Sequence, residues 1–532
     1  MSFFPQLLFA AFAICLCSCD QQGQGVDFEK RSISYSLSQE PPTLSSIGPV
    51  SSVAFTVQAH VFEGLMRMDE NKKLVGGVAD SWEIKKDSAL FKIRKNAKWS
   101  DGSAVTAHDF VYAWQIASSP KNEYNFIMAP IKNASAIAKG ELSPDKLGIK
   151  ALDDYTLSID FAYPCAYFPT LTTFVTFMPM KQSFHEQFPG REYASDADKI
   201  LYNGPFTISR WTKETQIELS KNIHYWNKDN IWLNEIKMPI IDQPRTVLNM
   251  FLSSDLCMAS LDADNIKSAL KNHIPIKAHN SGYVTYIEFN QRPGRLTTNK
   301  KLRQAIALVT SSSDLVNKVI GIPGNFPAQS LFPSWLPGAE QELYREHNFI
   351  PQETNYEKAK ALIQQARQEL KLEKIKLTYL VTDSPGSIKT AEYIQFQLKH
   401  RLDIDLAIDI QTFKLRIEKS NRGDFDLVGG GWGPDYYDPM TFGDLFTSWN
   451  NNNRGRFKNE AYDQLVREAN ESIDPKLRSL NFLKMHQILL EEVPIHPLVE
   501  RGSVYISDPR LKNVLRVISG GDPNFIYARI DQ

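Results

Sequence analysis

Residues 77 to 114 decide the fold. They read Gly77-Val-Ala-Asp-Ser-Trp-Glu, then Phe91-Lys-Ile-Arg-Lys-Asn-Ala-Lys-Trp-Ser-Asp-Gly, then Val105-Thr-Ala-His-Asp-Phe-Val-Tyr-Ala-Trp114. Phe91 and Ile93 fall on one face of a short strand, and the Ser-Asp-Gly that follows is typical of a turn. Thr106 with Asp109 three residues later predicts a helix N-cap with an acidic third residue. This stretch therefore predicts a strand, a turn and a helix, with no chemistry of its own.

Together these segments resemble the signature of the extracellular solute-binding proteins of peptide ABC transporters. In that family a Gly-Val-Ala-Glu-Ser-Trp strand leads into Phe-x-Leu-Arg-x-x-Ala-Lys-Trp-Ser-Asp-Gly, and a helix opening Val-Thr-Ala-x-Asp-Phe-Val follows. The resemblance implies an α/β fold of the periplasmic-binding-protein type, cluster C or type II. Such a fold has two lobes on a hinge and an extra subdomain, which makes three domains.

The order of family-like motifs places the domain boundaries. Residues 31–61 begin domain I, 62–181 form domain II, 182–283 return to domain I, 284–498 form domain III, and 499–532 return to domain I. Within domain III, periodicity predicts a helix from a Thr354–Glu357 capping box, a strand at 374–382, a helix at 390–400 and a strand at 404–410. This β-α-β order predicts that the two strands are parallel.

The N-terminus resembles a lipoprotein signal peptide over residues 1–18. An apolar run without charge ends at Leu16-Cys17-Ser18-Cys19, and Cys19 is the expected acylated residue. The run is too short to span a membrane, which takes about 20 apolar residues. The first six residues lack Lys and Arg, so an ordinary secretory signal or short anchor is the alternative. Residues 19–30 are expected to form a polar tether, and Asp20 resembles an inner-membrane retention signal.

Composition limits the classes of partner. The net charge is −1, which gives no electrostatic reason to expect nucleic acid. At 532 residues the chain is longer than a domain with a single hydrophobic core, so two or three domains are expected. Apart from the cysteines near the N-terminus, only Cys165 and Cys257 remain, and two buried free thiols are expected rather than a disulfide.

A second informative segment is Gly429-Gly-Gly-Trp-Gly-Pro-Asp-Tyr-Tyr-Asp-Pro-Met440. It resembles the family segment Gly-Trp-x-x-Asp-Tyr-x-x-Pro, whose aspartate takes the ammonium of a peptide ligand, and that residue is Asp435 here. A carboxylate in a closing cleft pairs strongly with an ammonium because little water remains. Trp432, Gly433 and Tyr436 are expected beside it, whereas Asp438 is expected to be a turn residue. A solvated Asp in a surface turn is the alternative.

The opposite wall of the expected cleft precedes Phe62-Glu-Gly-Leu65, a match to the family's Phe-Glu-Gly-Leu. Three further sets of ligand-binding residues are expected: Ser51, Ser52 and Val53 along the peptide backbone, Tyr124 or Phe126 at the mouth, and Phe413 in place of a family tryptophan. Pairing with the ligand's main chain would give affinity without reading side chains.

The family's basic residues for the ligand's C-terminal carboxylate are missing. Ser387, Ser420 and Gly429 stand at the matching positions, with Lys389, Arg416 and Arg422 nearby as substitutes. If none substitutes, the ligand is longer, modified at its C-terminus, or not a standard linear peptide.

The chain thus resembles the oligopeptide-binding lipoprotein of a bacterial ABC importer. It is expected to be a monomer in the periplasm or cell envelope, with an oligopeptide and ABC permease subunits as partners and a lipid anchor in the inner membrane. Alternative ligands for a binding protein with this fold are a muropeptide, a dipeptide, a nickel chelate or haem. The alternative of another functional class is a surface adhesin or a peptidase that uses the same fold. No metal, phosphate-loop or nucleophile motif predicts a cofactor or an enzyme.

Overall fold

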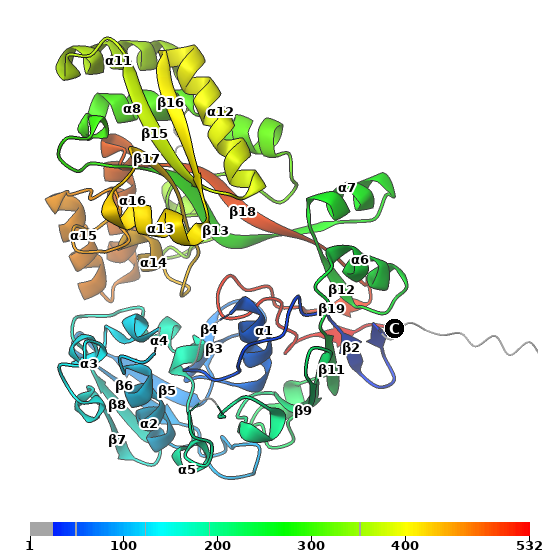
Figure 1. The fold of residues 1–532 in the computed structure, drawn as a ribbon. Helices are drawn as coiled ribbons and strands as arrows, with labels where there is room; N and C mark the ends of the chain where they lie inside the picture. The colour runs from blue at the N-terminus through cyan, green and yellow to red at the C-terminus, as the bar shows by residue number, and fades with distance from the viewer. Residues whose placement is uncertain (1–24, 48–50, 123, 191, 350–352) are drawn as a thin grey trace, which may run out of the picture.

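The computed structural model describes residues 25–47, 51–122, 124–190, 192–349 and 353–532. The chain forms two lobes, one above the other in Figure 1, which long strands connect on one side. The described N-terminal and C-terminal segments both lie in the lower lobe (Figure 1). The predicted signal peptide and Cys19 lie outside the described residues.

The lower lobe contains a five-stranded sheet in the order β1-β2-β11-β10-β9 and a four-stranded sheet in the order β5-β6-β8-β7. The first consists of β1 (Val26–Asp27), β2 (Ser32–Ser34), β9 (Phe206–Thr212), β10 (Gln216–Lys221) and β11 (Glu235–Pro239). The second consists of β5 (Ala79–Ile84), β6 (Ser88–Ile93), β7 (Ile149–Asp153) and β8 (Thr156–Asp160). Two small pairs are β3 (Met66–Met68) with β4 (Leu74–Gly76), and β19 (Leu511–Lys512) with β20 (Arg529–Ile530). The helices of this lobe are α1 (Ser52–Val61), α2 (Ala107–Ala117), α3 (Ala134–Ala138), α4 (Phe168–Leu171) and α5 (Gln182–His185).

The upper lobe is built on a seven-stranded sheet in the order β12-β18-β13-β17-β15-β16, with β14 also paired to β18. Its strands are β12 (Met258–Leu261), β13 (Lys277–Phe289), β14 (Phe326–Pro327), β15 (Ile375–Thr382), β16 (Ile404–Gln411), β17 (Leu427–Trp432) and β18 (Ile495–Ser507). Its helices are α8 (Lys300–Val309), α9 (Ser312–Asp314), α10 (Leu343–His347), α11 (Tyr356–Leu370), α12 (Pro385–Leu402), α13 (Phe413–Arg422), α14 (Met440–Gly443), α15 (Glu460–Glu471) and α16 (Pro475–Glu492). Near the junction, α6 (Pro244–Leu252) and α7 (Ala263–Lys271) flank β12 (Figure 1).

Strands β13 and β18 connect the lobes (Figure 1). Each is 13 residues long, and they pair antiparallel from Lys277–Tyr505 to Glu288–Ile495. Their register shifts twice, between Asn280 and Tyr283 and between Thr285 and Tyr286. Because irregular pairing interrupts the ladder and bends the strands, these shifts are natural places for a change of angle between the lobes.

The signature stretch folds as its local chemistry predicts. Strands β5 and β6 pair antiparallel, and α2 begins after Thr106 with a complete capping box that includes Asp109. The apolar face is fully covered, since Phe91, Phe110 and Trp114 have no exposed surface. This unit therefore belongs to the core of the lower lobe.

The predicted β-α-β unit is confirmed, with two corrected boundaries. Strands β15 and β16 pair parallel over their full length. Helix α11 is capped by Asn355 and not by Thr354, because the Asn355 side chain accepts from the Lys358 amide. Helix α12 begins five residues earlier than predicted, because Pro385 is well suited to the first helical position.

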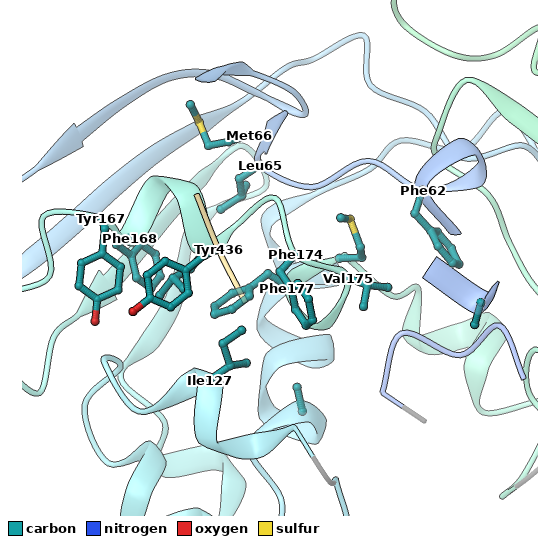
Figure 2. Packing of buried hydrophobic residues seen from close by; sticks show 14 of the residues in the cluster. Phe62, Leu65, Met66, Ile127, Tyr167, Phe168, Phe174, Val175, Phe177 and Tyr436 are labelled. Atoms are coloured by element: carbon teal, nitrogen blue, oxygen red, sulfur yellow. The ribbon is translucent and has the colours of Figure 1, made fainter. Parts of the chain in front are cut away.

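Aromatic side chains connect the two lobes away from the crossing strands. The rings of Tyr167 in the lower lobe and Tyr436 in the upper lobe stack at 4.9 Å with an interplanar angle of 4°. Figure 2 shows Tyr436 beside Tyr167 and Phe168, at the edge of the apolar cluster of the lower lobe. On the same side, Lys86 Nζ lies 3.2 Å from Glu471 Oε2. The two lobes therefore also contact each other away from the crossing strands.

Cys165 and Cys257 are buried and free, as expected. Among the described residues, no helix is both long enough and apolar enough to cross a membrane.

Candidate ligand-binding site

Strand β17 carries the second informative segment into the sheet. Gly429, Gly430 and Gly431 pair with β13, and two of these glycines are required by tyrosines of that strand. A Cβ on Gly430 would lie 2.5 Å from the Tyr286 ring, and one on Gly431 would lie 2.4 Å from the Tyr283 ring. The glycines therefore let two aromatic rings lie directly over the strand.

The loop after β17 lies at the boundary of the lobes. Within it, Tyr437 lines a cavity of about 250 Å³ together with Trp335 of the upper lobe. The lower lobe supplies the facing wall, which includes Phe55, Phe62 and Val175. A ligand held by this loop would therefore lie between the lobes and meet apolar groups of both.

Asp435 has no cationic partner among the described residues. Burial raises the pKa of its carboxyl from 3.8 to about 6. Its main-chain N–H donates to Thr441 Oγ1 at 3.2 Å, which fixes the backbone but leaves the carboxylate unpaired. A poorly hydrated, unpaired carboxylate is unfavourable, and an ammonium placed against it would relieve that cost. Asp435 is the residue that the Gly-Trp-x-x-Asp match predicts to bind the ligand ammonium.

Asp444 is a second such carboxylate, which the sequence reasoning missed. It follows α14, and none of the described basic side chains forms an ion pair with it. Burial, and in addition the charge of Asp435, raises the pKa of Asp444 to about 7. No local pattern marks Asp444, because its position depends on how α14 packs near the end of β17, where Thr441 accepts from the Trp432 indole. The two acids together give this region a strong preference for a cation.

Asp438 has a structural role, in line with its prediction as a turn residue. Its two oxygens accept from the Arg478 guanidinium at 2.8 Å each, and Oδ1 also accepts from the Met440 amide at 2.9 Å. This carboxylate is therefore already paired, unlike Asp435 three residues before it.

The predicted neighbours of Asp435 serve the protein's own packing. Trp432 is half-buried, and its indole N–H donates to Thr441 Oγ1 at 3.4 Å. Gly433 lies against Tyr283, and Tyr436 is occupied by its stack with Tyr167. These residues shape and shield the place where Asp435 lies.

On the opposite wall of the predicted cleft, Ser51, Ser52 and Val53 do not form one extended segment. Helix α1 begins at Ser52, so only Ser51 has extended backbone, and its hydroxyl caps the helix by accepting from the Ala54 amide at 3.1 Å. Ser52 and Val53 lie in the first helical turn and line a cavity of about 280 Å³. The expectation that all three add to a ligand strand is therefore wrong, because Ser51 starts a helix.

Tyr124 and Phe126 lie in one aromatic row. Their ring centroids are 5.3 Å apart, and Tyr124 stacks on Phe174, which in turn meets Phe55 of α1 edge to face. Phe126 is 54% exposed and Tyr124 is half-buried. The row extends from α1 to the surface.

Phe413 opens α13 and lines a further cavity, of about 620 Å³, in the upper lobe. Ser387, Gly429 and Arg416 line it as well. Of the other residues named for the ligand carboxylate, Ser420 is buried and bonds to the Arg416 carbonyl, and Arg422 pairs with Asp424 at 2.8 Å.

Comparison with known proteins agrees with this architecture. The family model for bacterial extracellular solute-binding proteins, family 5 Middle, matches residues 73–454. The periplasmic murein peptide-binding protein MppA of Escherichia coli (strain K12) is 30% identical over 491 residues, which cover 91% of this chain and 90% of MppA. The oligopeptide-binding protein OppA of Bacillus subtilis (strain 168) is 29% identical over 533 residues, or 96% of each chain.

Solved structures agree as well. The unliganded open form of the murein tripeptide binding protein MppA has a TM-score of 0.82 at 27% identity, covering 94% of this chain and 98% of that one. Listeria monocytogenes OppA bound to peptide has a TM-score of 0.72 at 30% identity, covering 94% and 99%. The family model and the full-length relatives lead to one conclusion: this chain belongs to the bacterial extracellular solute-binding proteins of family 5.

Proposed function

We propose that this protein is the peptide-binding component of an ABC importer, which captures oligopeptides between its lobes and delivers them to a membrane permease. The observation that carries the proposal is Asp435, a poorly hydrated carboxylate at the boundary of the lobes that has no cationic partner in the described part of the chain. An α-ammonium is the cation that every unblocked peptide supplies. We assign it to Asp435, with Asp444 adding negative potential nearby.

The mechanism is closure around the ligand. The higher TM-score with an unliganded open form than with a peptide-bound structure supports an open arrangement here. A peptide that binds one lobe and then contacts both favours the closed form only by its higher affinity for that form. Closure removes water from Asp435, which strengthens its pairing with the ammonium. The permease would then recognise the closed protein.

A murein peptide is the second candidate ligand. It is favoured by the match to MppA, whose name describes murein peptide binding and whose length this chain covers almost fully. A murein peptide carries additional charged groups, so it would use the same cleft with different polar contacts. A dipeptide would use the same anchor, Asp435, whereas a nickel chelate or haem would use the cleft without an assigned anchor.

Native mass spectrometry of the purified protein tests the proposal. The expected result is co-purified peptides whose masses fit sums of amino-acid residues, released on mild unfolding. The Asp435→Asn variant serves as the matched control, since it should retain far less peptide. A wild-type protein that carries no peptide, and that gains none when incubated with a peptide mixture, would contradict the proposal.

We also propose that the domain boundaries lie at residues 61/62, 181/182, 283/284 and 498/499.

We further propose that the mature protein is anchored to the inner membrane by a lipid on Cys19. Attachment to the membrane would then depend on that lipid. Cys19→Ser should abolish incorporation of labelled palmitate, whereas Cys17→Ser should leave it unchanged. Equal labelling of wild type and Cys19→Ser would exclude Cys19 as the acceptor.

A further inference from the structure

The wall of the 250 Å³ cavity between the lobes carries more basic than acidic side chains. Among the residues that the structure describes, the one acidic side chain in this wall is Glu63, which lies 3.5 Å from the Arg67 guanidinium. The charges of these two residues balance each other. Three other basic residues line the cavity and form its basic corner: Lys72, His279 and Arg516. A ligand ammonium does not account for this corner, which favours a group of the opposite charge.

Lys72 supplies an unpaired ammonium to the basic corner. It lies in the turn between β3 and β4 of the lower lobe, which are drawn beside α1 in Figure 1. Within the described part of the chain, no carboxylate forms an ion pair with this ammonium and no group accepts a hydrogen bond from it. Partial desolvation lowers its pKa, which means that the charged form has lost part of its hydration. An anion placed against Lys72 would compensate for that loss.

Arg516 adds a buried guanidinium, although part of it is already paired. The residue is 8% exposed, and its Nε and Nη2 donate to the two carboxylate oxygens of Asp522 at 2.8 Å and 2.6 Å. The third nitrogen, Nη1, is buried and has no hydrogen-bond partner among the described residues. Asp522 lines the cavity of about 280 Å³ instead, so an anion in the 250 Å³ cavity would meet Arg516 rather than that carboxylate.

His279 is a further donor when it is protonated. It belongs to the crossing strand β13, and its buried Nε2 has no hydrogen-bond partner in the described part of the chain. Burial, and then the charges of Arg516 and Lys72, lower the pKa of the ring to about 4. The ring is therefore neutral in the empty protein at neutral pH. A nearby anion favours the protonated form, in which both ring nitrogens donate.

The rest of the cavity wall indicates what carries the anion. Phe55 and Phe62 of the lower lobe line it together with Trp335 and Tyr437 of the upper lobe, so most of the contact surface is apolar or aromatic. Tyr437 follows Asp435 by two residues, which span at most about 7 Å. The cavity therefore begins beside the proposed ammonium site. An anion in the basic corner would lie at the end of a short apolar arm, close to the N-terminus of the ligand.

We propose that Lys72, His279 and Arg516 form an anion subsite for an acidic side chain near the N-terminus of the peptide ligand. The proposal rests on peptide binding as the function and on Asp435 as the ammonium site. A glutamate side chain supplies both parts, since its methylenes contact the apolar wall while its carboxylate accepts from the basic corner. Side chains of an extended ligand follow each other at about 3.3 Å. The acidic residue should therefore be one of the first three, and peptides with such a residue are the preferred substrate class.

Glutamate and glutamine peptides test the subsite, because the two side chains have the same shape and differ in charge. The mixtures are pentapeptides of Ala, Leu and Phe with both ends free and with one Glu at a single defined position. Each mixture competes with its counterpart that carries Gln at that position, so the terminal carboxylate is the same in both. Native mass spectrometry quantifies the retained peptides. Wild-type protein should retain Glu peptides about tenfold more than Gln peptides at one of the first three positions.

Variants of one turn locate the effect. Lys72→Gln should reduce the Glu preference to about twofold or less while still retaining peptides, and Lys72→Glu should reverse it in favour of Gln. His279→Gln should reduce the preference in part, because it removes one ionisable donor. Lys73→Gln is the matched control: Lys73 is the next residue of the same turn, is exposed, and does not line the cavity, so this variant should behave as wild type. Thermal melting confirms that each variant is folded.

Each outcome decides a different question. Peptides retained by wild type without a Glu preference at any of the first three positions would overturn the subsite, as would an unchanged preference in folded Lys72→Gln. An equal preference at all five positions, or an equal loss in Lys73→Gln, would show general attraction between charges and would also overturn it. If wild type retains no peptide from any mixture, peptide binding itself fails, and the subsite fails with it.

Discussion

Replacing Asp435 with Asn should stabilise the empty protein and weaken its binding of peptides. Burial raises the pKa of this carboxyl from 3.8 to about 6, and each unit of pKa corresponds to about 1.4 kcal/mol. The charged form therefore costs the folded, empty protein up to about 3 kcal/mol at neutral pH. Asn keeps the shape of the side chain and cannot ionise. It also removes the charge that contributes to the raised pKa of Asp444.

The pH dependence has a definite sign. Because the folded protein holds the Asp435 proton more tightly than the unfolded chain, wild-type stability falls as pH rises from about 4 to about 6. Above that range the full cost is present. The difference in unfolding free energy between Asp435→Asn and wild type should therefore be about 3 kcal/mol at pH 7.5. It should be close to zero at pH 4.

Urea unfolding of ligand-free protein at both pH values measures this difference. Asp438→Asn is the matched control three residues along the loop. It should destabilise the protein by about 3–5 kcal/mol at neutral pH, because it leaves the Arg478 guanidinium buried without its partner. An Asp435→Asn variant that is less stable than wild type at pH 7.5, or equally altered at pH 4, would refute the reasoning.

Binding should change in the opposite direction. Calorimetry with an unblocked peptide at pH 7.5 should show a loss of about 2–5 kcal/mol in Asp435→Asn. Acetylating the peptide N-terminus should cost wild type a similar amount but add little to the loss in the variant, since both changes remove one contact. Additive losses would show that the ammonium binds elsewhere.

Two further substitutions test the packing around the site. Tyr436→Ala removes the stack on Tyr167, which is worth about 0.5–1.5 kcal/mol and restrains the two lobes. The radius of gyration of the ligand-free protein, measured by small-angle scattering, should therefore increase. An unchanged value would show that the stack does not restrain the lobes. Gly430→Ala should lower the unfolding free energy by about 1–3 kcal/mol, because the new Cβ would lie 2.5 Å from the buried Tyr286 ring. Gly386→Ala, which has open space, is its control and should be neutral or slightly stabilising; equal effects would contradict the packing argument.

Local chemistry explains which parts of the fold could be predicted. The capping box at Thr106 and Asp109 involves residues three apart, so it is readable without knowledge of the tertiary structure. The same holds for the alternation in β16 and the helical periodicity of α11. The two wrongly predicted helix starts also have a local cause. Asn355 and Pro385 each compete with a nearby residue as a helix start, and the sequence alone did not decide between them.

The site residues depended on contacts between distant segments. Asp435 and Asp438 lie in one loop and have the same side chain. They differ because Arg478, forty residues after Asp438, pairs with Asp438 and gives it a structural role. Arg416 looks like an ordinary polar residue of a short helix. Its burial arises because α13 packs against β15 and β16, which carries its guanidinium over Gly429. The resemblance named Asp435 as a candidate, but no local pattern distinguished the buried Arg416 from the exposed Arg422.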